Sequence, residues 1–199
     1  MIENLVDRFI NYQKELGTIQ EKDVEVYRYG YIVFIELLLN SCLSLGIGSV
    51  MGAFKEVLFF LFVFIPLRSF CGGYHADKAW RCVILSNFII IASVLTAKCT
   101  WIYKMPKSAK LVVLGTAALC IGIAAPVENE NKKMERKEKR KYKWITGVVL
   151  LAEVMLAILL LFQGKEKGFQ IILISFIDQV ILITMALIKA KKWKVSFPE

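Results

Sequence analysis

Six apolar stretches, separated by polar or charged segments except between the first two, make up more than half of this 199-residue chain. They run approximately over residues 31–47, 50–67, 80–97, 111–125, 144–162 and 169–188. Several approach the roughly 20 residues that an α-helix needs to cross about 30 Å of hydrocarbon. The chain is 57% hydrophobic and still carries 26 Lys and Arg, so apolar and basic segments must alternate. The sequence therefore predicts an all-α, polytopic membrane protein with about six transmembrane helices.

We expect residues 1–199 to form a single integral membrane domain, with the transmembrane bundle over 31–188. The boundary between the first two spans is the least defined, because Gly46, Gly48 and Gly52 interrupt the apolar pattern there. The acidic residues Glu3 and Asp7 precede any apolar run, which does not fit the basic start of a signal peptide.

The distribution of basic residues predicts the topology. With six spans, both termini, the 68–81 loop and the 128–143 loop lie on one side of the membrane, and these segments hold 19 of the 26 Lys and Arg. Short cytoplasmic loops carry the excess of positive charge in membrane proteins. We therefore expect a multi-pass protein of the cell membrane, with both termini and the 68–81 loop in the cytoplasm.

The N-terminal region, residues 1–28, predicts an amphipathic helix ahead of the first span. Apolar residues recur there at helical spacing, and charged residues lie between them: Ile2, Leu5, Val6, Phe9 and Ile10 against Glu3, Asp7 and Arg8. Such a helix can dock on the membrane surface or close over a substrate. It can equally pack against the cytoplasmic ends of the bundle, and the sequence does not separate these alternatives.

Residues 128–143 predict a basic cytoplasmic loop of mixed charge, which favours a solvated face, with contact to anionic lipid headgroups or an acidic peptide as the alternative. The net charge of +9 does not indicate nucleic-acid binding, because no basic segment carries the aromatic interleaving or zinc-ligand spacing of that class. One histidine and five scattered cysteines predict no metal site, and nothing indicates a cofactor.

The segment from residue 66 to 82 carries the residues suited to chemistry. It contains His75, which is the single histidine of the chain, and Cys82 seven residues later. Seven residues of helix separate two side chains by about 10 Å, which is too far for a hydrogen bond. If Gly72 and Gly73 break the helix, His75 can fold back over the first turn of the next span and meet the thiol.

Cys82 is the preferred nucleophile of this segment. A cysteine in the first turn of a helix lies at the positive end of the helix dipole, and Lys78 and Arg81 are close in sequence, so each of these features favours the thiolate. Cys71, the rival, comes at the end of the preceding span, where the dipole is negative.

The spacing of these residues resembles the signature of the AgrB family of quorum-sensing membrane cysteine endopeptidases. The matching positions are Arg68, Gly72, Gly73, His75, Ala76, Cys82 and Ser86, and a weaker match covers Ala125, Pro126, Val127 and Lys132. The resemblance extends over nearly the whole chain in size and number of spans. It implies that His75 and Cys82 are the catalytic pair and that Arg68 and Gly73 matter for activity, in substrate binding or in structure.

The resemblance further implies a substrate and an assembly: a short AgrD-like precursor peptide, cleaved on the cytoplasmic face, and a homodimer in the lipid bilayer. Attack of a thiolate on a peptide carbonyl gives an acyl-enzyme thioester. A thiol or hydroxyl of the substrate can then displace the enzyme and close a thiolactone or lactone ring. The residue that orients His75 stays unassigned among Asp77, Glu128 and Asn129.

Two other functions remain open at this point. A six-span transporter or peptide exporter would need polar stripes facing inward, for which Glu36, Glu153 and Asp178 are the candidates. Pairing of these acids between helices, with Lys, Asn40 or Gln179, is the alternative that we favour. A membrane scaffold without catalytic activity would tolerate replacement of His75 or Cys82.

Overall fold

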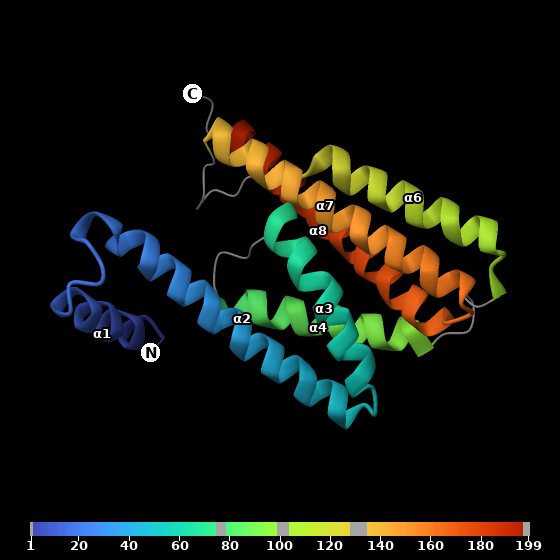
Figure 1. The fold of residues 1–199 in the computed structure, drawn as a ribbon, viewed down its shortest axis with the longest axis horizontal. Coiled ribbons are helices and arrows are strands. Elements are labelled where there is room, and N and C mark those ends of the chain that lie inside the picture. The colour runs from blue at the N-terminus through green and yellow to red at the C-terminus, as the bar shows by residue number, and fades with distance from the viewer. Residues whose placement is uncertain (1, 75–78, 99–103, 128–134, 197–199) are drawn as a thin grey trace.

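The computed structural model describes residues 2–74, 79–98, 104–127 and 135–196, and for a few residues inside helices, Cys82 among them, it describes the backbone alone. The helices are α1 (Ile2–Glu15), the short 3-10 helix η1 (Glu21–Asp23), α2 (Val24–Val50), α3 (Phe54–Cys71), α4 (Ala79–Lys98), α6 (Lys107–Ala124), α7 (Arg136–Phe162) and α8 (Glu166–Ser196). Figure 1 shows their arrangement.

Each of the six apolar stretches forms one of the helices from α2 to α8, which confirms the all-α fold. By length and composition, α2, α6, α7 and residues Glu166–Ala190 of α8 are able to cross a membrane. Helix α3 is as long as α6 but carries Lys55, Glu56 and Arg68 in its 18 residues, and the apolar part of α4 is the shorter stretch Val83–Ala97. The structure thus supports a polytopic membrane protein, while the number of six spans stays a prediction.

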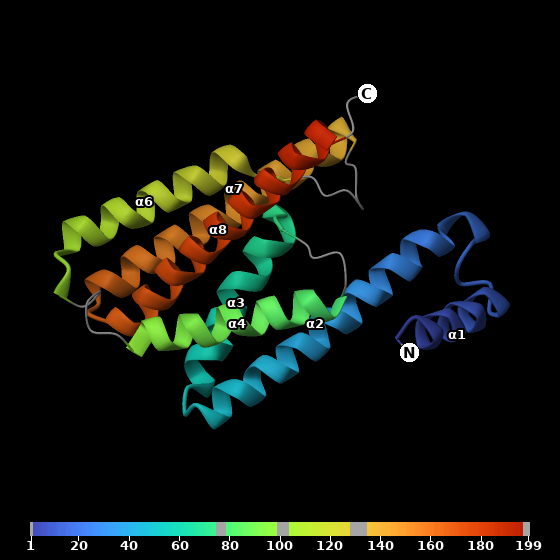
Figure 2. The ribbon, with the colours of Figure 1, turned by 180° about the vertical axis from the view of Figure 1, so that it is seen from behind.

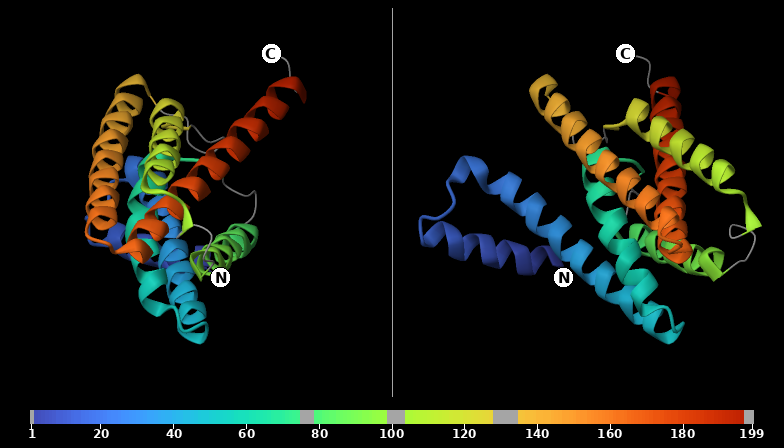
Figure 3. Two further views of the ribbon diagram at one scale, coloured as in Figure 1. Left: turned by 90° about the vertical axis from the view of Figure 1, so that its right-hand side faces the viewer. Right: turned by 45° about the vertical axis from the view of Figure 1, so that its right-hand side comes forward.

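Helix α8 is the central helix of the bundle. It packs against α3, α4, α6 and α7, and in the left view of Figure 3 its N-terminal half lies among these helices. Phe169, Ile172 and Phe176 of α8 are completely buried (0% exposed), in a core to which α3 and α7 also contribute. Close packing of this kind makes α8 the element against which its neighbours are positioned.

Three predicted boundaries are corrected by the structure. The second apolar helix begins at Phe54 rather than at residue 50, because the chain turns at Gly52, which has φ of +63°. Residues 136–143, predicted as loop, belong to α7; Glu135 caps its start, with its carbonyl accepting the Lys139 N–H at 2.8 Å. The N-terminal region ends earlier than predicted, since α2 already begins at Val24. Polar and charged residues at the starts of α2 and α7 can extend these two helices because such residues need no burial.

Helix α1 packs against α2, and the amphipathic character predicted for it is confirmed. Val6 and Ile10 are buried, and Asp7 pairs with Arg28 of α2 at 2.7 Å. The guanidinium lowers the pKa of the Asp7 carboxyl by hydrogen bonding. A second apolar row on α1, which includes Leu5 and Phe9, is exposed. Of the two alternatives, the structure shows packing on the bundle's first long helix, and membrane contact of the exposed row stays a prediction.

Candidate functional site

The glycine pair after α3 breaks the helix as the sequence predicts. Helix α3 ends at Cys71, and Gly72 and Gly73 have φ of +71° and +132°, values that side-chain-bearing residues rarely adopt. Space is restricted as well, because a Cβ atom on Gly72 would overlap the carbonyl oxygen of Val127, and a Cβ on Gly73 would overlap Nη1 of Arg68. Both positions therefore require glycine for conformation and for room.

Arg68 holds the chain on the far side of this break. Its Nη1 donates to the carbonyl oxygen of Gly72 at 2.5 Å, and its Nη2 donates to the carbonyl oxygen of Tyr74. The planar guanidinium can bridge two acceptors in a way that a lysine ammonium cannot reproduce. A cation at this point also lies at the negative C-terminal end of α3. Arg68 thus binds the segment directly ahead of His75, and a role in substrate binding stays a prediction.

The two sequence segments that carried the family resemblance meet in space. The Val127 N–H donates to the carbonyl oxygen of Cys71 at 2.9 Å, and Val127 forms an isolated parallel bridge with Gly72. Pro126 and Val127 are buried, and the Ala125–Pro126 peptide bond is cis. Residues more than 50 positions apart are therefore joined backbone to backbone at the end of α3. Lys132, the last residue of the second segment, lies outside the described residues.

Helix α8 binds this loop through two hydrogen bonds, and the sequence did not predict this contact. Nε2 of Gln179 donates to the carbonyl oxygen of Gly72 at 2.9 Å, so that this oxygen accepts from both Arg68 and Gln179. The Tyr74 N–H donates to the carbonyl oxygen of Leu182 at 3.0 Å. Gln179 is completely buried (0% exposed). The available signal was an amide side chain in a long apolar helix, which has to find a hydrogen-bond partner.

The predicted catalytic residues both follow the described part of the loop in sequence. His75 and Asp77 lie outside the described residues, as do Glu128 and Asn129, so contact between His75 and Cys82 stays a prediction. Cys82 is the fourth residue of α4, in the first turn, as the sequence predicts for a nucleophile near the positive end of a helix. Seven residues, 72–78, connect α3 to this turn.

Helix α4, which carries Cys82, is anchored by polar side chains one and three turns further on. Nδ2 of Asn87 donates to Oδ1 of Asn40 in α2 at 2.8 Å, and Ser44 donates to Oδ1 of Asn87 at 3.2 Å. The hydroxyl of Ser93 donates to Oδ2 of Asp178 in α8 at 2.8 Å. Figure 2 shows α4 lying between α2 and α8. Asp178 is thus bonded between helices, though to Ser93 and not to the partners considered from sequence.

Two further cysteine and serine positions can be placed. Cys71 is completely buried (0% exposed) at the end of α3, and the preference for Cys82 stays a prediction. Ser86 is half-buried in α4, one turn beyond Cys82.

Comparisons of the sequence with known proteins identify its relatives. The family model described as Accessory gene regulator B matches residues 3–184. "Putative AgrB-like protein 2" of Clostridium perfringens (strain 13 / Type A) is 31% identical over 177 residues, covering 80% of this chain and 78% of the relative. "Putative AgrB-like protein" of Clostridium perfringens (strain SM101 / Type A) is 30% identical over 176 residues, with the same coverage. No solved structure matches the chain.

The family model covers more than nine-tenths of the chain, including α1 and almost all of the bundle. Both segments that meet at the end of α3 fall inside the match. The chain belongs to the AgrB family.

Proposed function

We propose that the protein is a membrane cysteine endopeptidase that cleaves a short AgrD-like precursor peptide on the cytoplasmic side of the cell membrane. Cys82 is the nucleophile and His75 the general acid and base. Membership of the AgrB family supports a part in the peptide processing of accessory gene regulator quorum sensing, and the catalytic assignment goes beyond that membership.

The observation that carries the proposal is the bracing of the chain directly ahead of His75. Arg68 and Gln179 bind the carbonyl oxygen of Gly72, and Arg68 also binds that of Tyr74. So many hydrogen bonds to one short loop fix the direction in which the chain leaves it. A catalytic imidazole needs this kind of restraint, because it has to stay within hydrogen-bond reach of the thiol. A solvated connecting loop would not need it.

The proposed reaction proceeds by acyl transfer. The Cys82 thiolate attacks the scissile carbonyl carbon, the C–N bond breaks, and His75 delivers a proton to the departing amine. The acyl group is then held on Cys82 as a thioester. A cysteine thiol of the same peptide then attacks the thioester carbonyl and gives its proton to His75. The bond between the acyl group and Cys82 breaks, and Cys82 leaves as the thiolate. The product is a cyclic thiolactone, or a lactone where a hydroxyl attacks, provided that water is excluded from the thioester.

The topology belongs to the same proposal. The ends of α3, α7 and α8 that carry the excess of basic residues would face the cytoplasm, together with both termini. The glycine loop lies at this end of the bundle (Figure 1). We also propose that two copies pair in the membrane, since homodimers are the commonest closed assembly.

Processing of an AgrD-like precursor in reconstituted vesicles tests the proposal. Mass spectrometry would follow wild type, Cys82→Ala and His75→Ala, with Cys71→Ala and Cys120→Ala as matched controls in the same fold. We expect cleavage to disappear in the first two variants and to persist in the controls. Cleavage that survives in Cys82→Ala would remove the endopeptidase proposal.

One observation favours a second candidate, the export of a peptide. Among the described residues, Glu153 of α7 and Ser175 of α8 have buried polar atoms without a hydrogen-bond partner. Inward polar groups of this kind can line a hydrated path through a bundle. Replacement of Glu153 by Gln would slow release of the processed peptide from vesicles if the path is used. Unchanged release would remove this candidate without affecting the first.

A further inference from the structure

Two consecutive residues of α8 form hydrogen bonds with two different parts of the candidate site. Asp178 accepts the Ser93 hydroxyl of α4 at 2.8 Å, and Gln179 donates to the carbonyl oxygen of Gly72 at 2.9 Å. Neighbouring residues on an α-helix point about 100° apart, since 3.6 residues complete a turn. One step along α8 is therefore enough to reach the helix of Cys82 on one side and the glycine loop on the other.

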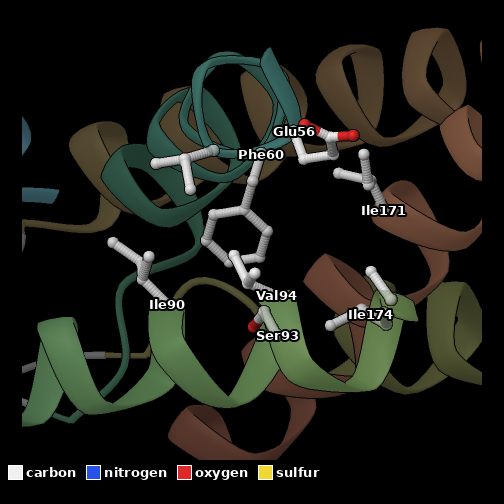
Figure 4. Close-up of a pocket in the computed structure, with 9 residues that line it drawn as sticks. Glu56, Phe60, Ile90, Ser93, Val94, Ile171 and Ile174 are labelled. Carbon is white, nitrogen blue, oxygen red and sulfur yellow. The ribbon is translucent and has the colours of Figure 1, made fainter. Parts of the chain in front are cut away.

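The direct contact between α3 and α4 is weak, which gives these two bonds their importance. A cleft opens between α3, α4 and α8, lined by apolar side chains that include Phe60, Ile90 and Ile174 (Figure 4). Ser93 lies on the α4 wall of the same cleft. Because few residues of α3 and α4 contact one another directly, packing between these two helices does not by itself set their separation.

The chain between the two helices adds little restraint of its own. The connection from α3 to α4 has seven residues and begins with two glycines, which are the most permissive residues for the backbone. Sequence proximity alone would therefore leave the loop and the first turn of α4 free to move relative to one another. Buried hydrogen bonds to a common rigid helix remove that freedom, and they are strong in a low-dielectric interior.

We propose that Asp178 and Gln179 are positioning residues, which fix the helix of Cys82 relative to the loop that carries His75. This inference rests on the proposed function. Asp178 acts through Ser93 on α4, and Gln179 acts through Gly72 on the loop, so neither residue touches the substrate. Loss of either bond changes the separation of thiol and imidazole while α8 keeps its core contacts.

The prediction is a defect in chemistry rather than in substrate binding. Misplacement by about 1 Å of a catalytic group can lower turnover by about 100-fold. Gln179→Leu, Gln179→Asn and Asp178→Ala should lower kcat about 10- to 100-fold with KM changed less than about twofold. The asparagine amide is too short to reach Gly72, and it preserves a polar side chain in case the leucine variant does not accumulate. Asp178→Asn keeps an acceptor for Ser93 and should retain activity.

A matched control lies two turns earlier on the same helix. Gln170 is also completely buried (0% exposed), and neither of its amide atoms has a hydrogen-bond partner. Gln170→Leu removes the same groups from the same kind of environment without touching the loop or α4. We expect this variant to cleave the precursor at the wild-type rate.

The experiment combines cleavage kinetics with the pH dependence of Cys82 alkylation, both in full-length protein in vesicles. A thiol paired with an imidazole is alkylated at lower pH than an isolated thiol. Mass spectrometry of the Cys82 peptide after iodoacetamide treatment should show the alkylation midpoint raised in the Gln179 variants and in Asp178→Ala, and unchanged in Asp178→Asn and Gln170→Leu.

Three results would overturn the inference. Wild-type kinetics and alkylation in the Gln179 and Asp178 variants, with Cys82→Ala inactive, would show that the endopeptidase proposal holds and the positioning role does not. Equal losses in Gln170→Leu and Gln179→Leu would mean that general packing of α8 matters rather than the two bonds. Cleavage by Cys82→Ala would remove the proposed function, and the inference with it.

Discussion

The glycine loop after α3 and the turn between α7 and α8 both reverse the chain at a glycine, but they differ in what surrounds it. Gly164 has φ of +73°, and a Cβ atom built on it would meet nothing within 4 Å. Gly72 has almost the same φ of +71°, yet its Cβ would overlap the backbone of Val127. The first glycine serves chain reversal. The second, Gly72, lets two segments that are distant in sequence come into backbone contact.

The largest effect is expected from Gly73→Ala, because this change combines an unfavourable φ with overlap of Arg68. The guanidinium would have to release the carbonyl oxygens of Gly72 and Tyr74, and the segment ahead of His75 would lose its direction. We expect precursor cleavage to become undetectable by mass spectrometry while the protein still accumulates in the membrane. Wild-type cleavage by this variant would refute the distinction between the two glycine turns.

Arg68→Lys should have the next largest effect. The charge is kept, but an ammonium cannot span the two carbonyl oxygens that the guanidinium binds. Loss of one such charge-assisted bond costs about 1.5–3 kcal/mol, so we expect cleavage to fall about 10- to 100-fold. Arg68→Gln serves as the comparison without charge. Equal and full activity in both variants would argue against bracing of the loop.

A smaller effect is expected at the anchor between α2 and α4. Asn87→Leu removes the bonds to Asn40 and Ser44, whereas Asn40→Ala leaves the bond to Ser44 in place. One buried hydrogen bond contributes about 1 kcal/mol, so Asn87→Leu should lower the thermal unfolding temperature more than Asn40→Ala does. Both should retain measurable cleavage. Identical melting of the two variants and wild type would exclude this anchor.

The smallest effect is expected from Gly164→Ala. Open space surrounds the position, so the cost is the positive φ, about 1–2 kcal/mol of stability. Thermal unfolding should begin at a slightly lower temperature, and the cleavage rate of the folded protein should equal that of wild type. Loss of cleavage at a normal melting temperature would contradict the comparison, since it would make the α7–α8 turn part of the site.

The sequence predicts the fold and the glycine loop well, because apolar length and glycine placement are local properties. It predicts neither the bond of Gln179 to Gly72 nor the meeting of Val127 with Gly72, since these depend on which helices pack together. Hydropathy does not predict that Lys110, which directly precedes the apolar stretch 111–125, is buried and paired with Glu166 at 2.6 Å. Tertiary pairing of this kind leaves no periodic signal in one chain.

Trapping of the acyl-enzyme tests the central claim most directly. Wild-type protein in vesicles would be mixed with precursor, quenched in acid and digested, and the Cys82 peptide would be weighed. We predict a mass increase on Cys82 equal to the acyl fragment of the precursor, removed by hydroxylamine as expected of a thioester. Precursor cleavage without any adduct on Cys82, or with the adduct on another cysteine, would contradict the account.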